Sequence, residues 1–493
     1  MVELSPLLIL GIIALYFLLL VGISYLTGKD SGNANFFLAG RKSPWYLVAF
    51  GMIGATLSGV TFISVPGVVG AGKVNMNFSY MQMVFGYLVG YLIIALVLLP
   101  VYYRYNLTSI YGYLNQRFGF YSYKIGSGYF LLSRVVGASL RLYLVGLVLH
   151  QFVTAPLFGI PFWLTVLITI ALIWVYTFRG GINTIVWTDT LQTTCMLAAV
   201  VLTIFAIGND LDKNLGELIT SVRQSEYAQM FFFKGGWSDP NNFFKQFISG
   251  VLIATVMTGL DQDMMQKNLS CKTLKESQTN VITFSVILIF AKFLFLALGA
   301  LLYIYAANYG LEIPGRTDLL YPEIALNHLS PFIGIMFILG LIAAAYSSAD
   351  SALTALTTSF CIDFLGFQED HADEELAKQQ KRTRLMVHIG FSVLLLIVIN
   401  VFNAVNDTAV ISKIFEWAGY TYGPLLGLFA FGIFTNLKIN ERWVIPVCII
   451  APVASYVLNV NNLFLNFQLG NLVILLNGLL TFFGLWAISH REE

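Results

Sequence analysis

The sequence predicts an all-α polytopic membrane protein, and two observations support this fold class. The chain of 493 residues is 57% hydrophobic and only 11% charged, which is far from the composition of soluble globular domains. Apolar stretches recur along the whole chain, and each is long enough to cross a hydrocarbon core about 30 Å thick. A membrane β-barrel would instead show short segments of alternating hydrophobicity. We therefore expect residues 1–493 to form a single membrane domain.

The apolar stretches predict thirteen transmembrane helices. The first is expected to be retained, because the segment Met1–Pro6 carries Glu3 and no Lys or Arg, and no cleavage site of small residues follows. The predicted spans are 5–26, 43–70, 76–101, 124–155, 161–178, 185–207, 243–265, 278–306, 330–364, 384–402, 409–434, 443–460 and 465–489.

The distribution of basic residues predicts the orientation. With the N-terminus outside, most of the 27 Lys and Arg residues fall in inside segments or at their edges, and the short outside loops keep only Lys73, Arg316 and Lys413. Because cytoplasmic loops collect Lys and Arg, we expect the N-terminus outside and the C-terminus in the cytoplasm. The remaining loops are too short for a soluble catalytic domain, and a net charge of +1 argues against a nucleic-acid partner.

The ninth span contains a cluster of oxygen-bearing side chains. Ala344, Ser347, Ser348 and Ser351 have the spacing i, i+3, i+4 and i+7, so they share one helix face, and Asp350 lies beside them. A carboxylate inside a lipid-embedded helix is costly and usually functional. Oxygen ligands suit a hard cation. The alternative is that the small residues serve close helix packing, but the carboxylate favours a cation site.

The second span is too rich in glycine, threonine, serine and proline, between Gly51 and Gly67, to form a regular helix throughout. Broken helices form ion and substrate sites at the centre of many transporters. A break here would expose backbone carbonyls near Gly54 and Leu57; a flexible, closely packed helix is the alternative. The hydroxyl groups available around the break are those of Thr56, Ser58 and Thr61.

Three further features contain charged residues. Asp189 lies just inside the sixth span after a Gly-Gly turn, where it can cap the helix N-terminus, bind a ligand or do both. The stretch 259–267 ends the seventh span and is compatible with capping and with side chains that reach the membrane interface. Arg134 and Arg141 share a face of the fourth span, and Lys292 lies in the eighth. We expect these cations either to pair with carboxylates or to hold an anionic substrate group.

The order of several motifs resembles the sodium/solute symporter family. The motifs are Phe37–Arg41, the Gly-Gly and Trp-Thr-Asp pattern within Thr177–Gln192, the segment Gln262–Lys267, the Ser347–Ser348 pair and the segment Gly419–Gly427. The likeness extends from about Phe36 to Gly427. It implies a leucine-transporter-type fold with two inverted five-helix repeats, at 43–207 and 243–434. One extra helix, 5–26, precedes the repeats and two helices, 443–489, follow them.

The resemblance also implies the site residues. A common sodium site would use the carbonyls of Gly54, Leu57 and Ala344 and the hydroxyls of Ser347 and Ser348. A second sodium ion, present in some members, would be held by Asp189, Asp350 and Ser351, where Asp350 replaces an expected serine. The substrate would contact Thr56, Ser58, Thr61, Gln82, Arg134 and Arg141. The position of a sugar-binding lysine in galactose transporters corresponds to Leu288, and Lys292 lies one turn later.

We therefore expect a symporter of the plasma membrane (the inner membrane in a bacterium) that imports a small polar organic solute with one or two Na+ ions by alternating access. A sugar or sugar acid is favoured; an amino acid, a monocarboxylate or another small anion is the alternative substrate. A proton-coupled or uncoupled carrier of the same fold also stays open, because Asp189 and Asp350 can share a proton when no cation is bound. The chain is not expected to be an enzyme, and its partners are the substrate and the lipid bilayer, with no obligate protein partner.

Overall fold

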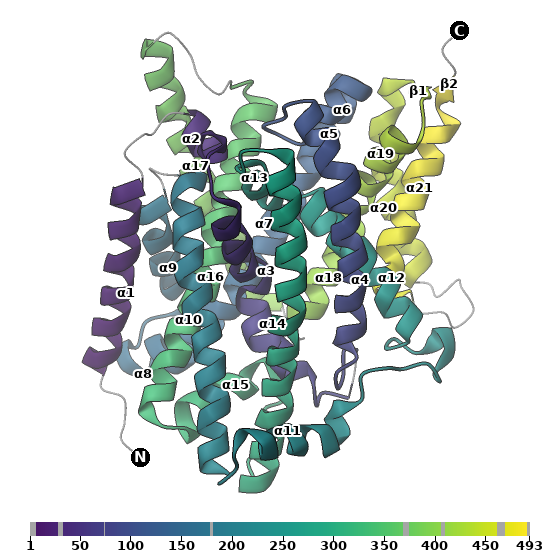
Figure 1. The fold of residues 1–493 in the computed structure, drawn as a ribbon. Coiled ribbons are helices and arrows are strands. Elements are labelled where there is room, and N and C mark those ends of the chain that lie inside the picture. Colours follow the sequence, from purple (N-terminus) through teal and green to yellow (C-terminus); the bar gives the residue numbers. More distant parts are fainter. Residues whose placement is uncertain are drawn as a thin grey trace.

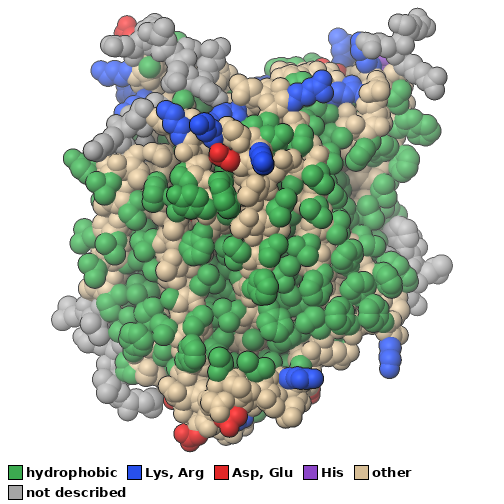
Figure 2. Space-filling view, viewed as in Figure 1, with side chains coloured by type: hydrophobic (Ala, Val, Ile, Leu, Met, Phe, Trp, Pro, Cys, Tyr) green, Lys and Arg blue, Asp and Glu red, His purple; other side chains and the backbone are tan. Residues whose placement is uncertain are grey.

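The computed structural model describes residues 6–27, 33–72, 74–177, 181–367, 374–405, 410–460 and 469–490. Long helices run side by side along one axis (Figure 1), and hydrophobic side chains cover the middle of the molecule (Figure 2). In the described part, ten helices are long and apolar enough to cross a membrane, or up to eleven if a bent pair forms one span. Two shorter apolar helices are Phe162–Thr177 and Gly423–Phe434. The polytopic α-helical class is confirmed, and the count of thirteen spans stays a prediction.

The longer helices follow the chain in this order: α1 (Pro6–Thr27), α3 (Trp45–Val68), α4 (Tyr80–Ile93), α7 (Phe120–Leu149), α9 (Phe162–Thr177), α10 (Gly181–Asp210), α12 (Phe243–Ala254), α14 (Leu274–Tyr309), α16 (Pro331–Ser359), α17 (Glu374–Val405), α18 (Val410–Thr421), α19 (Gly423–Phe434), α20 (Val444–Val460) and α21 (Val473–Ala487). The shorter helices are α2 (Asn33–Leu38), α5 (Leu99–Arg104), α6 (Gly112–Arg117), α8 (Ala155–Phe158), α11 (Leu215–Gln224), α13 (Gln262–Leu269) and α15 (Leu320–Glu323). Strands β1 (Lys438–Ile439) and β2 (Ser489–His490) pair antiparallel.

Two helical segments are broken inside the molecule. Helix α3 is interrupted at Ser58, whose φ of 44° and ψ of 172° do not belong to a helix. The helical segment Phe243–Gly259, which consists of α12 and the turn that follows it, bends by 66° into α13. The sequence predicts the first break, whereas the second replaces the continuous span expected at 243–265. The stretch 262–267 is buried rather than interfacial, and Lys267 is only 1% exposed, so the expectation that these side chains reach the membrane interface is wrong.

Helix α3 lies at the centre of the bundle, in contact with α10, α14 and α16. Gly51 permits the close approach of α3 to α10, because a Cβ atom added at Gly51 would lie 2.9 Å from the Cβ of Asp189. At Gly54 an added Cβ would overlap the side chain of Thr193 on α10. The glycines of α3 therefore let the part of this helix before its break pack closely against α10, beside Asp189.

The two ends of the molecule differ in charge. Figure 2 shows Lys and Arg side chains gathered at the upper end, with few at the lower end. The upper end contains α2, α5, α6 and the β1–β2 pair, and the lower end contains α8, α11 and α15 (Figure 1). Helix α1 starts at the lower end and α21 finishes at the upper end (Figure 1). This arrangement accords with an odd number of membrane crossings.

Candidate sodium and substrate sites

A buried acidic cluster lies where α10, α13 and α16 meet. Asp189 of α10 accepts two hydrogen bonds of 2.6 Å, one from the Nζ of Lys267 and one from the Oγ of Ser347. Helix α10 begins at Gly181, two turns before Asp189, so this carboxylate is too deep in the helix to cap its N-terminus. The capping alternative is therefore wrong, and Asp189 instead joins three helices.

Asp350 of α16 belongs to the same cluster but has different partners. Its Oδ2 accepts a hydrogen bond of 2.9 Å from the hydroxyl of Tyr176, and its Oδ1 accepts one of 2.5 Å from the backbone N–H of Ser351. Both donors are neutral. Asp350 is completely buried, and it forms no ion pair with any Lys, Arg or His in the described ranges.

Neutral oxygen atoms suited to sodium lie next to this cluster. Gly54 and Leu57 precede the break in α3, and Ala344, Ser347 and Ser348 lie on α16, which packs against α3. The Oγ of Ser348 is buried and has no hydrogen-bond partner among the described residues. A buried polar atom without a partner is costly, and an additional oxygen ligand of this kind suits a hard cation. The residues present therefore fit a sodium ion held between α3 and α16.

A second ionic network surrounds the bend between α12 and α13. Asp261 caps α13 by accepting hydrogen bonds from the backbone N–H groups of Asp263 and Met264. Its other oxygen accepts a hydrogen bond from Tyr422 and lies 3.8 Å from the guanidinium of Arg134, which also forms an ion pair with Asp263. The expected pairing of intramembrane cations with carboxylates thus holds for Arg134, with Asp261 and Asp263 as its partners.

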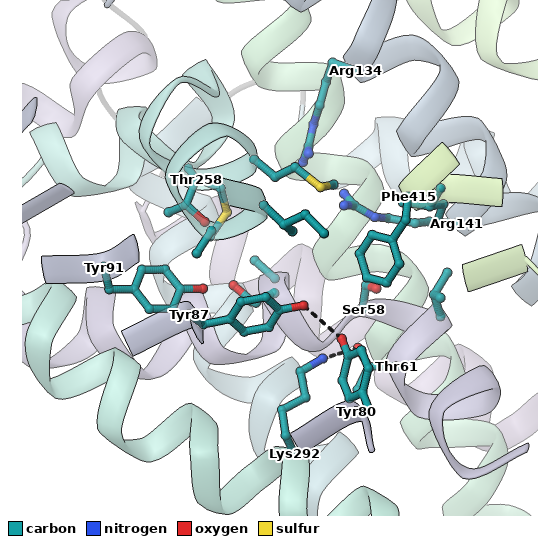
Figure 3. Close-up of a pocket in the computed structure, with 18 residues that line it drawn as sticks. Ser58, Thr61, Tyr80, Tyr87, Tyr91, Arg134, Arg141, Thr258, Lys292 and Phe415 are labelled. Carbon is teal, nitrogen blue, oxygen red and sulfur yellow. Dashed lines mark hydrogen bonds between the residues drawn. The ribbon is translucent and has the colours of Figure 1, made fainter. Parts of the chain in front are cut away.

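A cavity of about 90 Å³ lies between this network and the break in α3. Its walls come from α3, α4, α7, α12, α13, α14 and α18 (Figure 3). Arg141 points into the cavity and has no hydrogen bond or ion pair with the described part of the chain. The Nζ of Lys292 donates a hydrogen bond of 2.7 Å to the Oγ1 of Thr61 and lies 5.5 Å from the ring centre of Tyr80 (Figure 3). No carboxylate is found among the described lining residues.

The structure gathers five of the six predicted substrate contacts in this cavity. Its lining includes Thr56, Ser58, Thr61, Arg134 and Arg141.

Gln82 also lies on α4 but is not among the lining residues, and it is completely buried. Its amide nitrogen donates to the carbonyl of Asn241 at 2.8 Å, and its amide oxygen accepts from the N–H of Phe232 at 3.0 Å. Gln82 therefore attaches the loop before α12 to α4, and the expectation that it faces the cavity is corrected.

Three residues of the acidic cluster were missed in the sequence analysis. The pairing of Lys267 with Asp189 links positions that are 78 residues apart, which helical periodicity alone does not reveal. Tyr176 lies at the end of the fifth predicted span and donates to Asp350, which is 174 residues further along the chain. Gln192 follows Asp189 by three residues, so the two side chains share one helix face. That spacing is the one signal from which Gln192 could have been found.

The fold is shared with solved transporters. A substrate-bound, outward-open structure of a Na+-coupled sialic acid symporter matches with a TM-score of 0.82 and 20% identity, over 98% of this chain and 99% of that chain. The nucleobase-cation symporter Mhp1 in a closed conformation matches with a TM-score of 0.56 and 14% identity, over 94% of this chain and 96% of that one. The molecule therefore has a leucine-transporter-type fold.

The profile of the Sodium:solute symporter family matches residues 36–443, and the chain belongs to this family. The sodium/sialic acid symporter SiaT of Proteus mirabilis (strain HI4320) is 26% identical over 477 residues, which cover 94% of this chain and 92% of SiaT. The human sodium/iodide cotransporter is 24% identical over 434 residues, covering 86% of this chain and 65% of the relative. The protein is a multi-pass plasma-membrane symporter that couples solute transport to Na+, and it is not an enzyme.

Proposed function

We propose that this symporter imports a small organic monoanion, with a sugar acid as the first candidate. The observation that carries this proposal is the presence of Arg141 and Lys292 in a cavity whose described lining holds no carboxylate. Lys292 is buried and Arg141 is half-buried, and cations inside a membrane protein are expensive unless a counter-charge is supplied. An anionic group on the substrate supplies that charge.

The number of charges around the cavity favours a single negative charge on the substrate. Arg134 is paired with Asp261 and Asp263, and Arg141 and Lys292 add two further cations. Three cations therefore face two carboxylates, and one positive charge is left over when all are ionised. A monoanion neutralises the network, whereas a neutral sugar leaves it charged.

The remaining wall suits a hydroxyl-rich substrate. Ser58 and Thr61 offer hydroxyl groups from the broken helix, and Tyr80, Tyr87 and Tyr91 add three more. The name of the relative SiaT specifies sialic acid, which is itself a sugar acid. The volume of about 90 Å³ is below the roughly 300–1,000 Å³ of typical ligand pockets. The cavity would therefore have to widen for a sugar acid, and its present size favours a short monocarboxylate as the second candidate.

Sodium binding is proposed between α3 and α16, with the carbonyls of Gly54, Leu57 and Ala344 and the hydroxyls of Ser347 and Ser348. Support comes from the break at Ser58, the contact between the two helices and the unpartnered hydroxyl of Ser348. A cation that contacts both helices holds them together and so favours the substrate-ready arrangement. Because α3 also lines the substrate cavity, sodium occupancy and the shape of that cavity are linked in an alternating-access cycle.

The proposed direction is import, with the N-terminus outside and the C-terminus in the cytoplasm. The gathering of Lys and Arg at the upper end of the molecule supports a cytoplasmic position for that end (Figure 2). A pocket of about 360 Å³ that includes Asn75, Lys245 and Glu416 shares Phe415 with the central cavity, and we assign it to the outer entry route. The repeats are placed at 43–207 and 243–434, each beginning with a broken helix, and no obligate protein partner is proposed.

The test is the thermal stability of the purified protein in sodium chloride and in potassium chloride, with paired solutes added. Glucuronate and glucose share a ring and differ in the carboxylate; sialic acid and lactate extend the comparison. A ligand that binds the folded state raises its stability by mass action. We expect sodium-dependent stabilisation by one of the anions and none by glucose. Stabilisation by glucose equal to that by glucuronate would overturn the anion proposal.

A further inference from the structure

We propose that Lys267 is the built-in counter-ion of Asp189, so that the acidic cluster accepts one sodium ion, which binds at Asp350. This inference rests on the proposed sodium-coupled function and concerns its second ion site. The family resemblance implies instead that Asp189 itself is a sodium ligand. The contacts of the two carboxylates separate these alternatives.

Both oxygens of Asp189 are already engaged. Oδ2 lies 2.6 Å from the ammonium nitrogen of Lys267, and Oδ1 accepts a hydrogen bond of 2.6 Å from Ser347. Lys267 is almost completely buried, so its charge needs a carboxylate partner. A sodium ion on Asp189 would lie next to the ammonium group, and the two positive charges would repel each other. Asp189 is therefore neutralised without sodium.

Asp350 is the carboxylate whose charge remains uncompensated. Its two hydrogen-bond donors, Tyr176 and the backbone of Ser351, are neutral. Asp189, Asp350 and Lys267 together supply two negative charges and one positive charge. A single monovalent cation at Asp350 makes the cluster neutral.

Further oxygen atoms beside Asp350 lack partners. The hydroxyl of Ser351 and the amide oxygen of Gln192 are buried and form no hydrogen bond within the described part of the chain. The Gln192 amide nitrogen donates at 3.4 Å to the hydroxyl of Tyr176, which donates in turn to Asp350. Gln192 therefore lies in the hydrogen-bond chain of the free carboxylate. A carboxylate, a hydroxyl and an amide oxygen form the hard donor set that an alkali cation prefers.

The decisive experiment compares a variant that lacks both members of the Asp189–Lys267 pair with a variant that lacks the Asp350 carboxylate. In the double variant Asp189→Asn/Lys267→Met, no unpaired charge is created, and binding of ²²Na+ to purified protein is counted with sodium alone as the probe. We expect the double variant to bind as many sodium ions as the parent protein, and Asp350→Asn to bind one fewer. Loss of one ion in the double variant, with the full number in Asp350→Asn, would overturn the proposal.

Gln192→Leu provides a second measurement that leaves every charge in place. We expect the sodium site at Asp350 to lose affinity about tenfold, because one oxygen ligand is removed. An unchanged affinity, combined with full sodium binding by Asp350→Asn, would assign Asp350 to a proton and contradict the inference. Failure of the parent protein to bind any sodium would be a different result, since it would refute the proposed sodium coupling itself.

Discussion

Two ionic networks inside the molecule have opposite net charge. The acidic cluster contains Asp189, Asp350 and Lys267, with one carboxylate in excess. The cavity network contains Arg134, Arg141, Lys292, Asp261 and Asp263, with one cation in excess. One network therefore needs a cation and the other an anion. With the proposed assignments, a chain with a net charge of only +1 has one site for a coupling cation and a separate site for an anionic solute.

Helix α13 belongs to both networks. Asp261 and Asp263 lie at its N-terminal end and contact Arg134, whereas Lys267 in its last turn contacts Asp189. Acidic groups near a helix N-terminus and a cation near its C-terminus both agree with the helix dipole. A displacement of α13 would alter the two networks together, so in the proposed mechanism this helix links sodium binding to solute binding.

The largest effect is expected when a paired cation is removed. Arg134→Met leaves Asp261 and Asp263 buried without their cation, and breaking a buried pair costs about 3–5 kcal/mol of stability. We expect a strongly lowered melting temperature and reduced yield of folded protein, measured by thermal unfolding in detergent. Lys413→Met is the matched control, because it breaks the exposed pair of Lys413 and Glu416 at 3.0 Å and should cost at most about 1 kcal/mol. Equal effects of the two variants would contradict the burial argument.

The second effect concerns an unpaired cation of the same helix. Arg141→Met removes a guanidinium that has no partner among the described residues, so we expect stability to be retained. Hydrogen bonds to charged groups contribute about 1.5–3 kcal/mol, which corresponds to roughly 10- to 150-fold weaker binding of the transported anion. The measurement is the concentration dependence of anion-induced stabilisation in sodium. A loss of stability as large as that of Arg134→Met would show that Arg141 is structural.

A smaller effect is expected at the other unpaired cation. Lys292 donates a hydrogen bond to Thr61 of the broken helix. Its ammonium group therefore has fewer N–H donors left for the substrate. We expect Lys292→Met to weaken anion binding about tenfold, as for a single hydrogen bond to a charged group. The preference of the protein for carboxylated over uncharged solutes should become smaller in the same variant. If an uptake assay found the same preference for carboxylated over uncharged solutes, Lys292 would not be a substrate-binding residue.

The sequence predicts the fold and the first break well because their signals are local. Glycine, serine and proline are concentrated in α3, and the break at Ser58 falls among them. The second break carries a weaker signal, since a single Gly259 precedes Asp261 and the acidic residues there resemble a membrane interface. The pairing of Lys267 with Asp189 and the engagement of Gln82 by Phe232 and Asn241 join distant segments. Such contacts depend on packing, which the pattern of a single helix does not contain.

The smallest effect concerns Asp318, a buried carboxylate that lies in a turn outside the spans and outside both networks. It accepts a hydrogen bond of 3.3 Å from the backbone N–H of Val410, and burial raises the pKa of its carboxyl above the ordinary value. Because the folded state holds this proton more tightly than the unfolded state, stability rises as pH falls through the raised pKa towards about 3.9, below which it levels off. We expect the melting temperature to rise more between pH 8 and pH 5 in the parent protein than in Asp318→Asn. Identical pH profiles would show that the carboxyl of Asp318 has the same pKa in the folded and unfolded states. Burial alone would then not raise the pKa of a carboxyl in this fold.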